Sequence, residues 1–104
     1  MTSIGVQFLE DLFEYLKEHG KKETIKTIIN SANIQQDMKQ ILLWKHYEGL
    51  LNKQIGVYIQ KKENLVEALS DRQVIRRHQR AMDSLHHSII ETFDSLIHVT
   101  PKVF

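Results

Sequence analysis

The sequence predicts an all-α protein: a four-helix bundle built on one long antiparallel helical hairpin, with two shorter helices at its N-terminal end. Apolar residues recur at intervals of three and four rather than two, which is the period of an amphipathic helix. The chain contains one Pro and four Gly, so little interrupts this period. No segment of its 104 residues has the composition of a linker, and we expect a single helical domain over residues 1–104.

Two short helices come first. One is expected over residues 3–19, ending at Gly20, because a glycine readily adopts the left-handed conformation that follows a helix. The other is expected over residues 23–31. Their apolar stripes consist of Phe8, Leu9, Leu12, Phe13 and Leu16 in the first helix and Ile25, Ile28, Ile29 and Ala32 in the second.

The two arms of the hairpin are expected over residues 33–69 and 71–98. At the start of the first arm, Asn33 is a candidate helix cap. Between the arms, Ser70 and Gln73 have the spacing of a capping box, in which each side chain bonds the backbone N–H of the other residue. This pattern predicts a chain reversal at residue 70.

A register follows from this reversal, because facing positions in a hairpin folded at residue 70 have numbers that add up to 140. Apolar pairs such as Ile55 with Leu85 satisfy it at the alternating spacing of a coiled-coil seam. The same register places Lys62 opposite His78, a polar layer inside an apolar seam.

Composition excludes several classes of protein. There is no Cys, which rules out disulfides, thiol chemistry and Cys-based zinc sites and is typical of a cytoplasmic protein. No run of 18 apolar residues is present, so we expect no membrane partner. No catalytic motif and no glycine-rich phosphate loop occurs, and the histidines lack the spacing of a metal site. We therefore expect no enzyme, no cofactor and no bound metal.

Charge is unevenly distributed although the net charge is only +1. Residues 1–20 carry −3, residues 21–80 carry +6 and residues 81–104 carry −2. The bases near the predicted reversal form a candidate site for an anionic partner: Lys61, Lys62, Arg72, Arg76, Arg77 and Arg80. The alternative is that these bases only pair with Glu63 and Glu67 across the hairpin.

A second candidate surface lies on the arm over residues 33–69. Its apolar residues exceed what two short helices can cover, and large exposed apolar patches usually mark contacts. The candidate interface with a second copy or another protein consists of Met38, Leu42, Leu43, Tyr47, Leu50 and Val57.

These features together predict a small, non-enzymatic regulatory or interaction protein that acts as a homodimer and presents helical surface to a macromolecular partner. The alternative is a nucleic-acid-binding protein that uses the basic segment from Lys61 to Arg80. A helix-turn-helix over residues 24–42 has the right outline, but Asn33 stands in the turn where glycine is usual, and Lys39 stands at a position that should be apolar.

Overall fold

The computed structural model describes residues 3–99, with side chains as far as Leu96. This part of the chain is helical and contains no strand, which confirms the all-α class. None of its helices is both long enough and apolar enough to cross a membrane. The elements are α1 (Ile4–Glu18), α2 (Lys22–Ser31), α3 (Gln36–Leu42), the π-helix η1 (Leu43–Tyr47), α4 (Asn52–Glu63) and α5 (Asp71–Val99).

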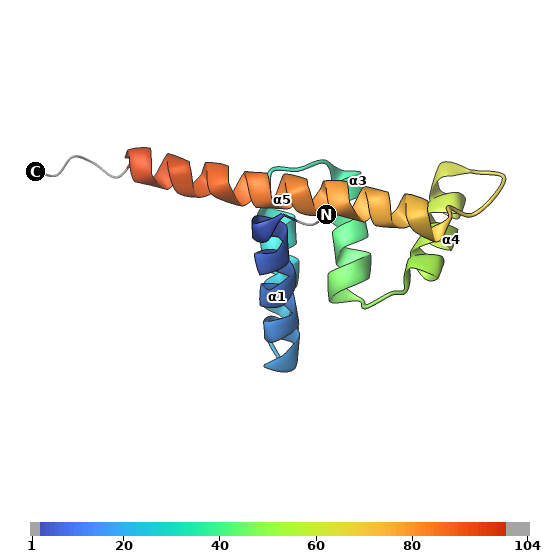
Figure 1. Cartoon of the computed structure of the whole chain (residues 1–104), viewed down its shortest axis with the longest axis horizontal. Helices are drawn as coiled ribbons and strands as arrows, with labels where there is room; N and C mark the ends of the chain where they lie inside the picture. Colours follow the sequence, from blue (N-terminus) through green and yellow to red (C-terminus); the bar gives the residue numbers. More distant parts are fainter. Residues whose placement is uncertain (1–2, 100–104) are drawn as a thin grey trace, which may run out of the picture.

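The α5 helix is the longest element, and α1, α3 and α4 pack directly against it (Figure 1). Its 29 residues give a length of about 43 Å at 1.5 Å per residue. The helices α1 and α2 pack side by side and run away from the middle of α5 at a steep angle (Figure 1). The α4 helix packs against the first turns of α5 (Figure 1). The last turns of α5 extend beyond α1 (Figure 1).

Local signals set the ends of α1 as the sequence predicts. Ser3 Oγ accepts a hydrogen bond from the N–H of Val6 at 3.1 Å, which caps the first turn. Gly20 has a φ of +69°, and the N–H of Lys21 bonds the carbonyl of Leu16 at 2.7 Å. This 6→1 bond belongs to a Schellman motif, which turns the chain from α1 into α2.

The prediction of one continuous helix over residues 33–69 is wrong. The helix that begins at Gln36 changes to the wider π-helical geometry in η1, where the N–H of Glu48 bonds the carbonyl of Leu43. It ends before Gly49, whose φ is +71°. Positive φ is accessible to glycine at no steric cost, so the chain turns here and restarts as α4. Asn33 does not cap this helix, because the N-cap position is Gln35. The N–H of Asn33 instead bonds Ser88 Oγ on α5 at 3.0 Å.

The predicted seam is also wrong, because the break changes which faces meet. Ile55 packs in one buried cluster with Val74, whereas Leu85 belongs to a separate cluster beneath α1 and α2. Gly56 contributes to this arrangement: a Cβ there would lie 2.5 Å from the carbonyl oxygen of Leu69. The glycine therefore permits close approach of the α4–α5 connection.

The chain reversal itself occurs close to where the sequence places it. The N–H of Ser70 bonds Gln73 Oε1 at 2.9 Å, and the N–H of Gln73 bonds Ser70 Oγ at 3.2 Å, so the capping box of α5 is confirmed. The preceding helix ends earlier than expected, at Glu63, where Asn64 takes a left-handed conformation with a φ of 55°. The reversal is therefore a loop over residues 64–70 rather than a tight turn.

Candidate functional site

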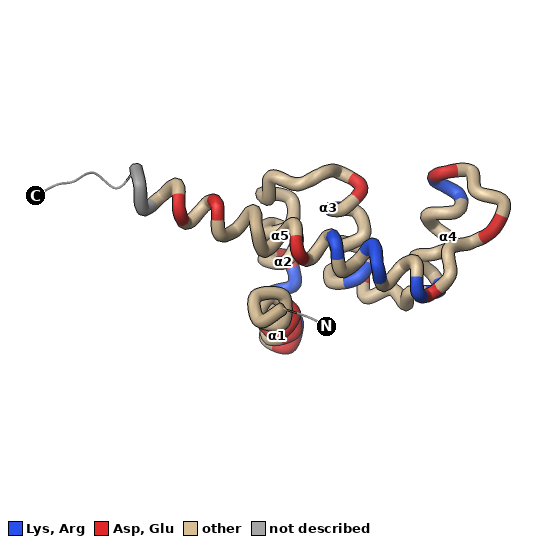
Figure 2. The backbone as a smooth tube through the Cα atoms, turned by 45° about the horizontal axis from the view of Figure 1, so that its top comes forward, with Lys and Arg blue, Asp and Glu red and all other residues tan. Residues whose placement is uncertain are grey.

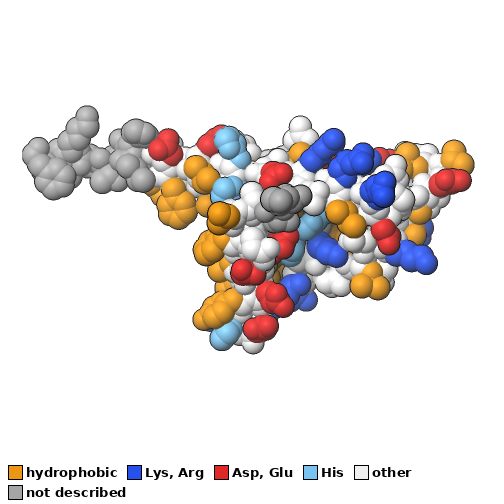
Figure 3. Space-filling view, viewed as in Figure 1, with side chains coloured by type: hydrophobic (Ala, Val, Ile, Leu, Met, Phe, Trp, Pro, Cys, Tyr) orange, Lys and Arg blue, Asp and Glu red, His pale blue; other side chains and the backbone are white. Residues whose placement is uncertain are grey.

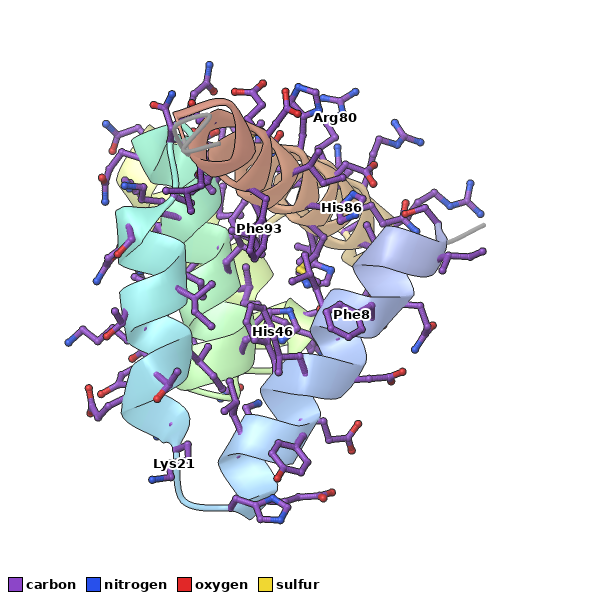
Figure 4. All side chains as sticks on the ribbon, turned by 90° about the vertical axis from the view of Figure 1, so that its left-hand side faces the viewer. Phe8, Lys21, His46, Arg80, His86 and Phe93 are labelled. Atoms are coloured by element: carbon purple, nitrogen blue, oxygen red, sulfur yellow. The ribbon has the colours of Figure 1, made fainter. Side chains whose placement is uncertain are left out.

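Three arginines form a row along the outer face of α5, and we call Arg72, Arg76 and Arg80 the arginine row. All three side chains are exposed, and their spacing of four residues puts successive members about 6 Å apart along the helix axis. No described residue forms an ion pair with any of them. Arg80 points away from the molecule (Figure 4), and basic side chains gather over this half of α5 (Figure 3), where Figure 2 shows basic residues along the backbone.

The other predicted bases differ from the row in what they contact. Arg77 donates two hydrogen bonds to the carboxylate of Glu63, at 2.7 and 3.2 Å, which joins α5 to the end of α4. These hydrogen bonds lower the pKa of Glu63 and raise that of Arg77. Lys61 and Lys62 are exposed in the last turn of α4. Glu67 forms no ion pair with Arg72. The alternative, in which the bases only pair with glutamates of the same chain, therefore holds for Arg77 but not for the arginine row.

The residues expected at a dimer interface face mostly inward. Leu42 is fully buried in the main cluster, with Met38 and Leu43 packed against it, and Leu50 packs against the second cluster. Val57 is half-buried on α4. Much of the apolar surplus on this stretch thus meets other helices of the same chain, because the break at Gly49 lets the stretch fold back on itself.

Tyr47, the last member of that set, is held by α2. Its hydroxyl donates a hydrogen bond to Glu23 Oε1 at 2.7 Å, and this bond raises the pKa of Tyr47. The Nζ atoms of Lys22 and Lys26 lie 4.9 and 5.2 Å from the centre of its ring. Tyr47 is therefore engaged within the chain rather than presented to a second copy.

A pair of histidines inside the molecule was not found from the sequence. His46 Nε2 lies 2.8 Å from His78 Nε2, so one imidazole donates a hydrogen bond to the other. His46 belongs to η1 and comes from below α5 (Figure 4), and its ring also contacts Phe13 at 5.0 Å between centroids. The predicted layer of Lys62 with His78 is therefore wrong: His78 faces His46.

Burial controls the ionisation of this pair. Desolvation, together with the nearby His78, Lys17 and Lys45, lowers the pKa of His46 to about 3. Desolvation and Lys45 lower the pKa of His78 to about 4. A cavity of about 370 Å³ opens beside the pair, lined by Glu10, Glu14, Lys17, Lys45, His46 and His78. At neutral pH both imidazoles are uncharged, and neither has a pKa near 7 as a general acid or base would need.

Within residues 3–96, no three His, Asp or Glu side chains are grouped closely enough to hold a metal ion. His87 Nε2 does lie 2.7 Å from Glu91 Oε1 on the surface of α5, as an i, i+4 pair. Such exposed pairs contribute little to stability.

Comparison of the chain with protein families, with curated proteins and with solved structures finds no match in any of the three.

Proposed function

We propose that the protein is a non-enzymatic interaction protein that presents the arginine row of α5 to an anionic macromolecular partner. The observation that carries this proposal is the exposure of three aligned arginines that make no ion pair with the described residues. Arg72 lies in the first turn of α5, where a cation opposes the helix dipole, so helix stability does not explain its presence. The partner that we propose first is a protein with an acidic surface.

A second candidate partner is nucleic acid. The regular step of the arginine row favours it, because a straight series of guanidinium groups on one long helix can contact successive phosphates. No aromatic side chain lies between the arginines in the sequence, so stacking of single-stranded bases contributes nothing to this surface.

Binding assays with two polyanions test both candidates. Poly-L-glutamate serves as the acidic polypeptide and a 20-base-pair DNA as the duplex, each at 50 and 200 mM NaCl. The triple variant Arg72→Gln, Arg76→Gln, Arg80→Gln is expected to lose at least tenfold in affinity at the lower salt concentration. For the duplex, each lost phosphate contact lowers the slope of log affinity against log salt by about 0.9.

A matched control separates the arginine row from net charge. Lys21, Lys26 and Lys53 are exposed, lie outside the row, and remove the same charge when all three are changed to Gln. This control is expected to retain most of the affinity. If the two triple variants bind equally, or if wild type binds neither polyanion at 50 mM NaCl, the proposal is wrong.

A further inference from the structure

Within residues 3–96, a large apolar surface formed by α1 and the end of α5 is exposed. We call it the α1–α5 corner. Apolar side chains run down the outer side of α1 and along the underside of the projecting end of α5 (Figure 3). Its large members are between 50% and 91% exposed: Ile4, Phe8, Tyr15, Ile90 and Phe93.

The corner is an angle between two helices, α1 and α5, in which one further helix could pack. Gly5 allows α1 to approach α5 closely, because a Cβ at this position would collide with the His86 ring on α5. Beyond this contact α5 continues past α1, with Phe93 directed downward from it (Figure 4). A helix laid along α1 would therefore also meet the underside of α5.

The apolar stripe of α1 is complementary to itself in the antiparallel direction. It contains Ile4, Phe8, Leu12 and Tyr15, at steps of four, four and three. Antiparallel pairing places Ile4 opposite Tyr15 of a second copy and Phe8 opposite Leu12. Both combinations bring apolar side chains from one face of each helix together.

We propose that a second copy of this chain occupies the corner. Its α1 packs antiparallel on this α1, with the Tyr15 end under Phe93, and a twofold axis repeats every contact. A buried aromatic side chain covers roughly 150–250 Å², so the three aromatic members at just over half exposure offer on the order of 350 Å² per copy, and the two isoleucines bring this to roughly 500 Å². The pair then buries roughly 1,000 Å², which is the minimum expected of a specific interface.

This dimer does not involve the arginine row, so either proposal can fail without the other. Sedimentation equilibrium at 5–100 µM measures the mass. Wild type is expected at twice 12.3 kDa. Tyr15→Lys and Phe93→Glu, each made alone, are expected to weaken dimerisation at least tenfold, because each puts a charge into an apolar contact.

Mixing the two variants tests the arrangement itself. In the mixed dimer the introduced Lys faces the introduced Glu across one contact, and the symmetry-related contact keeps native Tyr15 and Phe93. The mixture is expected to regain dimers that neither variant forms alone. Val66→Glu, at an apolar side chain that is 96% exposed in the α4–α5 loop, is the matched control and is expected to remain dimeric.

Circular dichroism establishes that each variant keeps its helical content, as expected for changes at exposed positions. Wild type that remains at 12.3 kDa up to 100 µM overturns the proposal and leaves the corner to a different partner. Dimers that survive both single changes, or a mixture that stays monomeric, also contradict this arrangement.

Discussion

At the scale of single residues, His46 and His78 control how the fold responds to acid. Both imidazoles are partly removed from water where η1 approaches α5, and in the neutral state they bond each other. Below the ordinary histidine pKa of 6.5, the unfolded chain takes up protons that the folded chain does not. The pair therefore stabilises the fold fully above about pH 6.5, and this stability is lost as pH falls toward their folded pKa values of about 4 and 3.

We expect the free energy of unfolding to fall by on the order of several kcal/mol between pH 7 and pH 4, as urea unfolding at several pH values will measure. His46→Gln keeps a hydrogen-bonding side chain but removes one titrating group. The free energy of unfolding of this variant should therefore fall less than that of wild type between pH 7 and pH 4. His87→Gln is the control, because His87 is exposed on α5. An unchanged pH dependence in His46→Gln would show that other groups cause the acid sensitivity.

At the scale of elements, the start of α5 is held by a cap in addition to the packing of Val74 against α4. Ser70 is exposed, yet its side chain and that of Gln73 satisfy two backbone N–H groups. The helix that begins there carries the arginine row, His78 and the α1–α5 corner. A local interaction therefore helps to set where this helix begins.

Loss of this cap has a defined cost. Ser70→Ala is expected to lower the free energy of unfolding by about 1 kcal/mol, because the N–H of Gln73 loses its acceptor. Ser70→Asp retains an acceptor and adds a negative charge that suits a helix N-terminus, so it is expected to match wild type. Denaturation midpoints compare the three proteins. Equal midpoints for Ser70→Ala and wild type would mean that water replaces the cap without loss.

At the scale of the whole molecule, charge and apolar surface are segregated. Figure 2 shows the acidic residues of α1 apart from the basic residues at the start of α5, and Figure 3 shows the apolar side chains of the corner on the outer side of α1. In the proposed dimer, twofold symmetry brings the acidic edges of the two α1 helices to the same side. Salt is then expected to act in opposite directions on the two surfaces.

We expect a rise from 50 to 300 mM NaCl to weaken polyanion binding at the arginine row but to leave self-association unchanged or stronger. Screening reduces both the attraction of arginines for anions and the repulsion between the acidic edges. Sedimentation and binding assays in the same buffers measure the two effects. Self-association that weakens steeply with salt would contradict an apolar interface between two α1 helices.

The sequence by itself determined the features that depend on neighbouring residues. The helical class, the glycine end of α1, the capping box at Ser70 and the pairing of Glu63 with Arg77 all appear as expected. Each involves residues close in the chain or joined by a short reversal. Their chemistry is therefore largely independent of how the remaining helices pack.

The tertiary structure alone decided where the helix from Gln36 breaks and which faces meet. A continuous helix and two helices separated at Gly49 have nearly the same apolar period, so periodicity cannot distinguish them. The direction that the chain takes after that break buries Leu42, brings His46 to His78 and leaves Phe93 uncovered. Such contacts join residues far apart in the sequence, and they follow from the path of the backbone through space rather than from any local pattern.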